Sequence, residues 1–356
     1  MGIPRLLPAV RSVSRPRNIV DFGGSVVGID GNVWLYRSIF TDAEKFATGY
    51  DGSSHVKYFI RRVQKLLAIG IRPLVVFDGA DLPAKFYTHK NRSSNRIVSM
   101  GRAVALRESG STNQSYNLFA KAADLKFQLV RDIMVSLEEE GIEAVVAPYE
   151  ADAQLSHLSK TGVVDLVVTE DSDLLVYGCT RVLFKWDPVS MFGLEVSGPL
   201  NQATPFMGLS SNEAVMACVL AGSDYGPGVR GLGISKALEL IRRCPRKVDG
   251  ESSLEEIIAR TSLIKDSELG HQVLENLRMA LYVFRHQTIF RVDECRLAPL
   301  NPYPGLESVS KYSEYLGRLY DSEHAYSVYR GRLHPVTFAP YSELNQHQLG
   351  NIVLNS

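Results

Sequence analysis

The chain has 356 residues, of which 45% are hydrophobic and 22% are charged, a composition that can bury a large α/β domain with appended helices and that argues against extensive disorder. Lysine plus arginine equals aspartate plus glutamate, at 39 each, so a protein of this charge that bound an anionic partner would have to separate its acids from its bases. No apolar run reaches about 18 residues and the N-terminus lacks a hydrophobic signal region, so we expect neither a membrane span nor a secretory signal.

Four short apolar runs rich in valine and isoleucine predict buried strands, at residues 25–29, 73–77, 142–147 and 164–168. Amphipathic patterns predict helices at residues 56–68 and 124–140, and each is followed by a glycine that can end a helix. This alternation predicts an α/β fold with a mostly parallel, twisted sheet and helices on both faces.

Beyond about residue 200 the sequence is mainly helical. Helices are predicted at residues 211–221, 234–243, 254–260 and 267–282, with a turn-rich segment at 222–233 and a short extended stretch at 288–297. Residues 91–95 and 109–115 are polar, and we expect them to be mobile.

Acidic residues follow each of the four predicted strands: Asp30, Asp78, the pair Glu150 and Asp152, and the pair Asp171 and Asp173. A single such acid is usually a helix cap or a turn former. Because the carboxyl ends of parallel strands meet at one edge of a sheet, four such ends predict a cluster of acids. Uncompensated carboxylates repel one another, so the cluster favours bound Mg²⁺ or Mn²⁺. Two such ions about 4 Å apart can drive phosphodiester cleavage.

No acid occurs between residues 84 and 107, although bases are frequent there. Four of these side chains share one helix face by their spacing, namely Lys85, His89, Arg92 and Arg96. A solvated helix face is the alternative, but the position close after Asp78 favours phosphate binding. Weak helix formers at 91–95 predict a segment that becomes ordered when phosphates neutralise it.

Several motifs, in this order, resemble the structure-specific 5′ nucleases of the flap endonuclease superfamily. They are Gly28-Ile-Asp-Gly31, Val76-Phe-Asp-Gly79, Ala147-Pro-Tyr-Glu-Ala-Asp-Ala-Gln154, Thr169-Glu-Asp-Ser-Asp-Leu-Leu175 and Gly222-Ser-Asp-Tyr225. The third and fourth are most similar to the exonucleases of that superfamily. At position 5 this chain departs from the pattern, because it has arginine where such nucleases usually have glycine.

The resemblance implies a role for each matching residue. It implies metal ligation by Asp30, Asp78, Glu150, Asp152, Asp171, Asp173 and Asp224. Lys85 and Arg92 would contact the scissile phosphate, with Arg96 as a further contact. Tyr36 would stack on a base, the alternative being a core aromatic. Gly2 would touch DNA, and Gly231, Gly233, Ser235 and Lys236 would hold the uncut duplex in a helix–two-turn–helix, often with K⁺.

The resemblance also implies three regions. They are a PIN-like nuclease core over residues 1–200 with a mobile helical arch at about 80–130, a helical DNA-binding region over 201–300, and a segment over 301–356 that packs back on the core. The helix–two-turn–helix belongs to the second region.

The function expected from this resemblance is 5′→3′ exonuclease activity on double-stranded DNA, with 5′-flap cleavage by two Mg²⁺ ions, in repair, recombination and replication. The alternatives are a flap endonuclease, a junction resolvase, a phosphatase-like hydrolase or an inactive DNA-binding scaffold. We expect a monomer in the nucleus that binds DNA with 5′ ends, nicks, gaps or flaps. Mismatch-repair proteins would bind through a C-terminal tail that this sequence lacks.

Overall fold

The strands form a sheet whose central part is parallel. The computed structural model describes residues 2–49, 53–124, 127–243, 267–303 and 312–341, together with Leu254 and Ile257. Within these residues the strand order of the main sheet is β1-β7-β6-β5-β2-β3-β4. The strands are β1 (Arg15–Asn18), β2 (Val26–Asp30), β3 (Arg72–Phe77), β4 (Glu143–Val146), β5 (Leu166–Thr169), β6 (Arg181–Phe184) and β7 (Phe192–Ser197). Neighbours from β6 to β4 pair in parallel, whereas β7 pairs antiparallel with β6 and β1.

The four predicted strands are confirmed as β2, β3, β4 and β5. Their side chains alternate between two hydrophobic clusters: Leu74 and Val76 of β3 join one cluster, and Val75 and Phe77 join the other. Strands buried on both faces need apolar residues at every position, which explains their continuous apolar runs. The parallel order brings the carboxyl ends of these strands to one edge of the sheet.

Helices cover both faces, as predicted. One cluster includes side chains from α2 (Gly31–Ser38), α4 (Ser54–Leu67) and α7 (Phe127–Glu139). The other includes side chains from α1 (Leu6–Ala9), α8 (Ala151–Lys160), α9 (Asp173–Val176), α10 (Ser211–Ala221), α11 (Ile234–Arg242) and α13 (Ser267–His286). The helical region after residue 200 therefore shares its hydrophobic core with the sheet.

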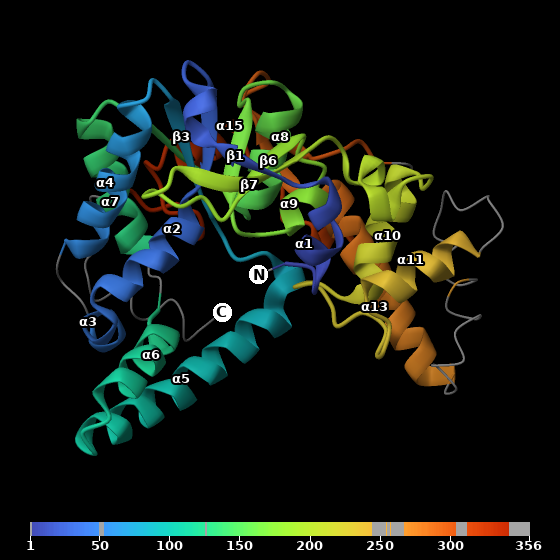
Figure 1. Cartoon of the computed structure of the whole chain (residues 1–356), viewed down its shortest axis with the longest axis horizontal. Coiled ribbons are helices and arrows are strands. Elements are labelled where there is room, and N and C mark those ends of the chain that lie inside the picture. Colours follow the sequence, from blue (N-terminus) through green and yellow to red (C-terminus); the bar gives the residue numbers. More distant parts are fainter. Residues whose placement is uncertain are drawn as a thin grey trace.

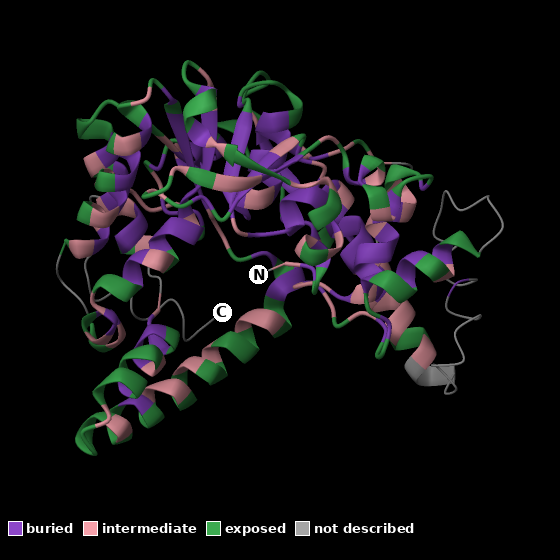
Figure 2. Ribbon diagram, viewed as in Figure 1, coloured by how far each residue is buried: buried purple, intermediate pink, exposed green. Residues whose placement is uncertain are grey.

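A long helical arm projects from the core (Figure 1). It consists of α5 (Phe86–Glu108) and α6 (Thr112–Ala122), and the turn η4 (Pro83–Lys85) leads into it. Most of α5 is exposed, in contrast to the buried sheet (Figure 2). The arm contacts the core again near α3 (Ala43–Thr48), where Tyr116 of α6 donates a hydrogen bond to the carbonyl of Phe40 at 2.6 Å. Residues 91–95 lie inside α5, and their mobility stays a prediction.

The extended stretch predicted at 288–297 is a two-stranded hairpin of β8 (Thr288–Arg291) and β9 (Arg296–Pro299). Helix α15 (Ser322–Tyr329) contacts β4, β8 and β9. The predicted helix at 254–260 lies largely outside the described residues. In the part of the chain that the structure describes, no helix combines the length and the apolar character that crossing a bilayer requires.

Candidate active site

Six of the predicted acids lie along the carboxyl edge of the parallel strands. Asp30 is the last residue of β2 and the N-cap of α2, and Asp78 directly follows β3. Beyond β4, Glu150 and Asp152 lie at the start of α8. Asp171 and Asp173 lie between β5 and the first turn of α9. The order of strands β5, β2, β3 and β4 therefore places all these acids side by side.

Hydrogen bonds fix the first two acids. Asp30 accepts from the backbone N–H of Val33 at 3.1 Å and from the hydroxyl of Thr169 at 2.7 Å. Asp78 accepts from the backbone N–H of Ala151 at 2.7 Å and from the amide of Asn32 at 2.7 Å. These donors come from neighbouring elements, so the geometry of the sheet edge determines where both carboxylates lie.

Burial and mutual repulsion disfavour the charged forms of the acids. Burial raises the pKa of Asp30 to about 7, and the charge of Asp78 adds to the shift. Burial raises the pKa of Asp78 to about 6, with a further contribution from Glu150. These shifts show that the two carboxylates lie in a poorly solvated cluster of like charges.

The acids that follow β4 and β5 experience the same effect. Burial, followed by the charge of Asp171, raises the pKa values of Asp152 and Asp173 well above the usual range. One carboxylate oxygen of Asp173, Oδ1, is buried and has no hydrogen-bond partner in the part of the chain that the structure describes. A buried carboxylate oxygen without a partner is costly, so this position calls for a cation or another donor.

Lys85 supplies a positive charge at the centre of the acids. Its ammonium lies 2.5 Å from Glu150 and 3.6 Å from Asp224, which follows α10. Burial alone would lower the pKa of Lys85, but the carboxylates of Glu150, Asp224 and Asp152 together raise it above its usual range. The turn η4, the sheet edge and the helical region thus meet at this side chain.

A buried chain of hydroxyl groups continues from Glu150 into the helical region. Tyr225 donates its hydroxyl hydrogen to Glu150, and its hydroxyl oxygen contacts the hydroxyl of Tyr177. Tyr177 donates to Oε1 of Gln287 at 2.5 Å. Sequence reasoning did not identify the supporting residues Asn32, Thr169, Tyr177 and Gln287. Of these four, only Thr169 could have been found from the sequence, because it is the first residue of the motif Thr169–Leu175.

The donor set fits hard divalent cations, because carboxylate oxygens predominate. The unpartnered oxygen of Asp173 and the raised pKa values of Asp152 and Asp173 also favour a bound cation, which would neutralise these carboxylates. As they stand, however, the described residues contain no group of three acidic, histidine or cysteine side chains arranged to hold one ion. Cation binding therefore requires some carboxylates to turn, or to bind through water.

The bases of α5 pair with acids of other segments. Arg92 pairs with Asp224 at 2.7 Å, and Arg96 pairs with Asp124 at 2.7 Å. His89 lies 3.1 Å from Asp81. Lys85 lies in the turn η4, directly before α5, so only His89, Arg92 and Arg96 of the four predicted side chains belong to the helix itself, although all four pair with acids. Arg92 is half-exposed and lies next to the acid cluster, where it can reach a phosphate.

Two of the predicted DNA contacts, Tyr36 and Gly2, differ in their surroundings. Tyr36 is 40% exposed and packs edge-on against Phe40, with ring centroids 6.4 Å apart. This exposure makes the alternative reading of a core aromatic wrong. Gly2 has a φ of 82°, and a Cβ there would lie 2.3 Å from Oδ1 of Asp171, so only glycine fits without a shift.

The turn-rich segment exposes its backbone in front of α11. Gly231, Gly233, Ser235 and Lys236 are exposed, and a Cβ added at either glycine would meet nothing within 4 Å. This open surface allows a phosphate to approach the backbone closely.

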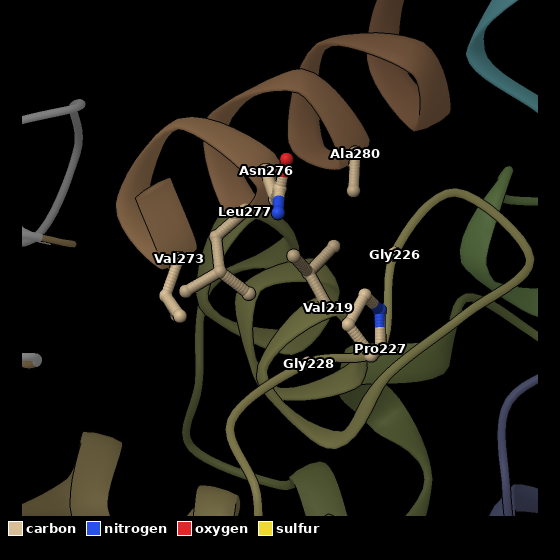
Figure 3. A pocket seen from close by; sticks show the side chains of 8 residues that line it. All are labelled: Val219, Gly226, Pro227, Gly228, Val273, Asn276, Leu277 and Ala280. Atoms are coloured by element: carbon tan, nitrogen blue, oxygen red, sulfur yellow. The ribbon is translucent and has the colours of Figure 1, made fainter. Parts of the chain in front are cut away.

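Behind this surface, the turn packs against α10 and α13 (Figure 3). Between them lies a cavity of about 10 Å³, which has room for one water at most. The residues that line it include Val219, Pro227 and Leu277. A Cβ at Gly228 would lie 2.4 Å from the backbone nitrogen of Gly222. Close packing thus fixes the path of the turn from behind.

Comparison with known proteins places this architecture in a family. The XPG N-terminal domain matches residues 1–98, and the XPG I-region matches residues 141–224. The chain belongs to the superfamily of XPG and flap endonuclease proteins.

Among named relatives, it is 30% identical to Exodeoxyribonuclease 1 of Schizosaccharomyces pombe, over 95% of this chain and 58% of that protein. It is 32% identical to Exonuclease 1 of Danio rerio, over 85% of this chain and 38% of that protein. The chain spans about half the length of the curated relatives it matches.

Solved structures agree on the fold. The catalytic core of Rad2 in complex with DNA substrate is 17% identical and has a TM-score of 0.57, covering 92% of this chain and 98% of that chain. Human GEN1 in complex with Holliday junction DNA is 20% identical and has a TM-score of 0.54, covering 80% of this chain and 66% of that chain.

Proposed function

We propose that this protein is a DNA nuclease acting at 5′ ends, a 5′→3′ exonuclease on double-stranded DNA with 5′-flap endonuclease activity. One observation carries the proposal: acids from four strand ends and from the helical region gather around Lys85 at one edge of the sheet. The similarity to proteins named Exonuclease 1 over most of the chain supports it.

The proposed metal ligands are Asp30, Asp78, Glu150, Asp152, Asp171, Asp173 and Asp224. Two bound Mg²⁺ ions, or Mn²⁺ in their place, would neutralise these charges, activate a water and stabilise the leaving oxygen of a phosphodiester. In the DNA-free protein, Lys85 and Arg92 share the carboxylate of Asp224. We propose that a substrate phosphate takes up these two cations, with Arg96 as a further contact, and so competes with Asp224.

The rest of the substrate would lie on the exposed residues described above. Tyr36 would stack on a base, since aromatic rings accept any base face. Gly231, Gly233, Ser235 and Lys236, with K⁺, would hold the uncut duplex. Action as a monomer in the nucleus, with mismatch-repair proteins as partners, is proposed on the similarity alone.

A nuclease assay with Mg²⁺ and with a chelator tests this function. The substrates are a duplex with a recessed 5′ end, a 5′ flap and a four-way junction. We expect cleavage of the first two with Mg²⁺ and none with the chelator. Cleavage of the junction alone would indicate a resolvase, and absence of cleavage on every substrate would refute the nuclease.

Two substitutions test the roles within the site. Asp173→Ala is expected to abolish cleavage while DNA binding stays measurable, because it removes a proposed metal ligand. Arg92→Ala is expected to reduce single-turnover cleavage by roughly a hundredfold or more. The control is Arg72→Gln, because Arg72 is exposed at the start of β3, on the opposite edge of the sheet. Full activity of Asp173→Ala would remove that residue from the metal site.

A further inference from the structure

The N-terminal segment contains a strained turn at Arg5. This residue has a φ of 63° and a ψ of 14°, and the backbone N–H of Leu6 donates to the carbonyl of Ile3 at 3.2 Å. With Pro4 before it, Arg5 occupies a position that is typical of a type II turn, where glycine or asparagine is preferred. Ile3 and Leu6 on either side are buried in the core, so the turn cannot relax by moving away.

Residues kept in unfavourable backbone conformations cluster at active sites and ligand-binding sites. Arg5 is exposed, and it makes no ion pair or side-chain hydrogen bond with any residue the structure describes. The burial of Ile3 and Leu6 holds the turn in place, but no side-chain contact among the described residues uses the guanidinium of Arg5. The guanidinium is therefore available to a ligand.

The N-terminal turn lies beside the acids. Arg5 lines a hollow of about 270 Å³ together with Gly2 and Ser172. Gly2 is packed against Asp171 and Asp173, since an added Cβ would lie 2.3 Å and 2.8 Å from their Oδ1 atoms. The hollow thus opens next to the carboxylates where the scissile phosphate would have to come.

We propose that Arg5 binds a phosphate of the DNA strand in this hollow and is a positioning residue of the nuclease. An unpaired guanidinium suits phosphate oxygens, because its N–H groups can donate two hydrogen bonds to one phosphate. It would supply positive charge from the N-terminal segment, whereas Lys85 and Arg92 supply it from the arm. This inference rests on the proposed function.

The test measures binding of a duplex with a recessed 5′ end by fluorescence anisotropy. All variants carry Asp173→Ala, and Mg²⁺ is present. The salt concentration is varied between about 50 and about 200 mM, the range over which phosphate contacts show their salt dependence. Arg5→Gly and Arg5→Asn both remove the charge and suit the turn, so neither should unfold the chain. Arg5→Lys keeps the charge. Arg72→Gln removes an exposed charge at the opposite edge of the sheet.

We expect Arg5→Gly and Arg5→Asn to weaken binding by about tenfold at the lowest salt. The slope of log K against log salt should fall by about 0.9, the contribution of one phosphate contact. Arg5→Lys should keep most of that slope, and Arg72→Gln should match the parent. Binding by both neutral variants with the affinity and slope of the parent would overturn the proposal.

The melting temperature provides a second readout. Arg5→Gly should melt at a higher temperature than the parent because the turn loses its strain, and a lower value would contradict the strained turn. If the wild-type protein cleaves DNA while the Arg5 variants bind normally, only this inference fails. If the wild-type protein neither binds nor cleaves DNA, the proposed function fails.

Discussion

At the scale of single residues, Glu150 is held from two sides. Its Oε1 pairs with Lys85 and its Oε2 accepts from Tyr225. Tyr225 in turn contacts Tyr177, and the ammonium of Lys85 lies 5.2 Å from the centre of the Tyr225 ring. A carboxylate fixed this way keeps its orientation while the charges around it change, which suits a residue proposed to hold a metal ion.

Tyr225→Phe tests this arrangement. The change removes the buried hydroxyl that donates to Glu150 and contacts Tyr177, so Glu150 loses a hydrogen bond. We expect the free energy of unfolding to fall by about 1–3 kcal/mol. Turnover should fall by roughly ten- to a hundredfold, because Glu150 is no longer held in place. Chemical denaturation and single-turnover cleavage measure the two effects.

The matched control is Tyr320→Phe. The hydroxyl of Tyr320 is also buried, but among the described residues it has no hydrogen-bond partner. Its removal should leave the stability unchanged or slightly higher, because an unsatisfied polar group is lost. An equal loss of stability in both variants would show that the contact with Glu150 contributes nothing specific.

At the scale of elements, α5 combines a fixed end with a weakly helical middle. Lys85 and Arg92 anchor its first turns to the acids. Further along, Asn91, Ser94 and Asn95 are exposed and have low helix propensity. The predicted mobility of this segment follows from that combination.

Hydrogen exchange tests the prediction. In the DNA-free protein, amides of residues 91–95 should exchange faster than those of the buried helix α8, and DNA should slow them. The double variant Ser94→Ala with Asn95→Ala should slow exchange without DNA, since each change favours the helix by about 0.5 kcal/mol. Asn113→Ala in α6 is the control. Slow exchange of these amides in the DNA-free wild-type protein would contradict the prediction.

Strands differ in how well the sequence predicts them. β2, β3, β4 and β5 are buried on both faces, and their continuous apolar runs made them recognisable. β1 has the sequence Arg-Pro-Arg-Asn and lies at the edge of the sheet. It forms because β7 offers it backbone partners, and no local pattern indicates such pairing.

At the scale of the whole molecule, the acid cluster links stability to pH. The pKa of Asp30 is raised to about 7 and that of Asp78 to about 6, from about 4 in an unfolded chain. A raised pKa means that the folded state binds the proton more tightly. The stability these two groups contribute is therefore present below pH 4 and is lost as the pH rises through 6 and 7.

Divalent cations should reverse that loss. We expect Mg²⁺ to raise the melting temperature little at pH 5 and progressively more from pH 6 to pH 8, because ligands must be deprotonated to bind. At 100 times the Kd, the stabilisation is about 2.7 kcal/mol. Thermal melts with Mg²⁺, with a chelator, and with sodium chloride at matched ionic strength measure it. A rise in melting temperature that is the same at pH 5 and pH 8 would contradict this linkage.

The sequence by itself determined the central strands, the covering helices and the acids at the strand ends, because apolar periodicity and chain order are local properties. It also determined the family, through motifs such as Thr169-Glu-Asp-Ser-Asp. The tertiary structure alone decided how the acids are partnered: that Lys85 lies between Glu150 and Asp224, that Tyr177 and Gln287 extend the cluster inward, and that Arg5 is strained. The contacts of Lys85, Tyr177 and Gln287 join segments far apart in the chain, and spacing along a sequence does not encode such contacts. The strain at Arg5 is local, but it persists because Ile3 and Leu6 are buried in the core.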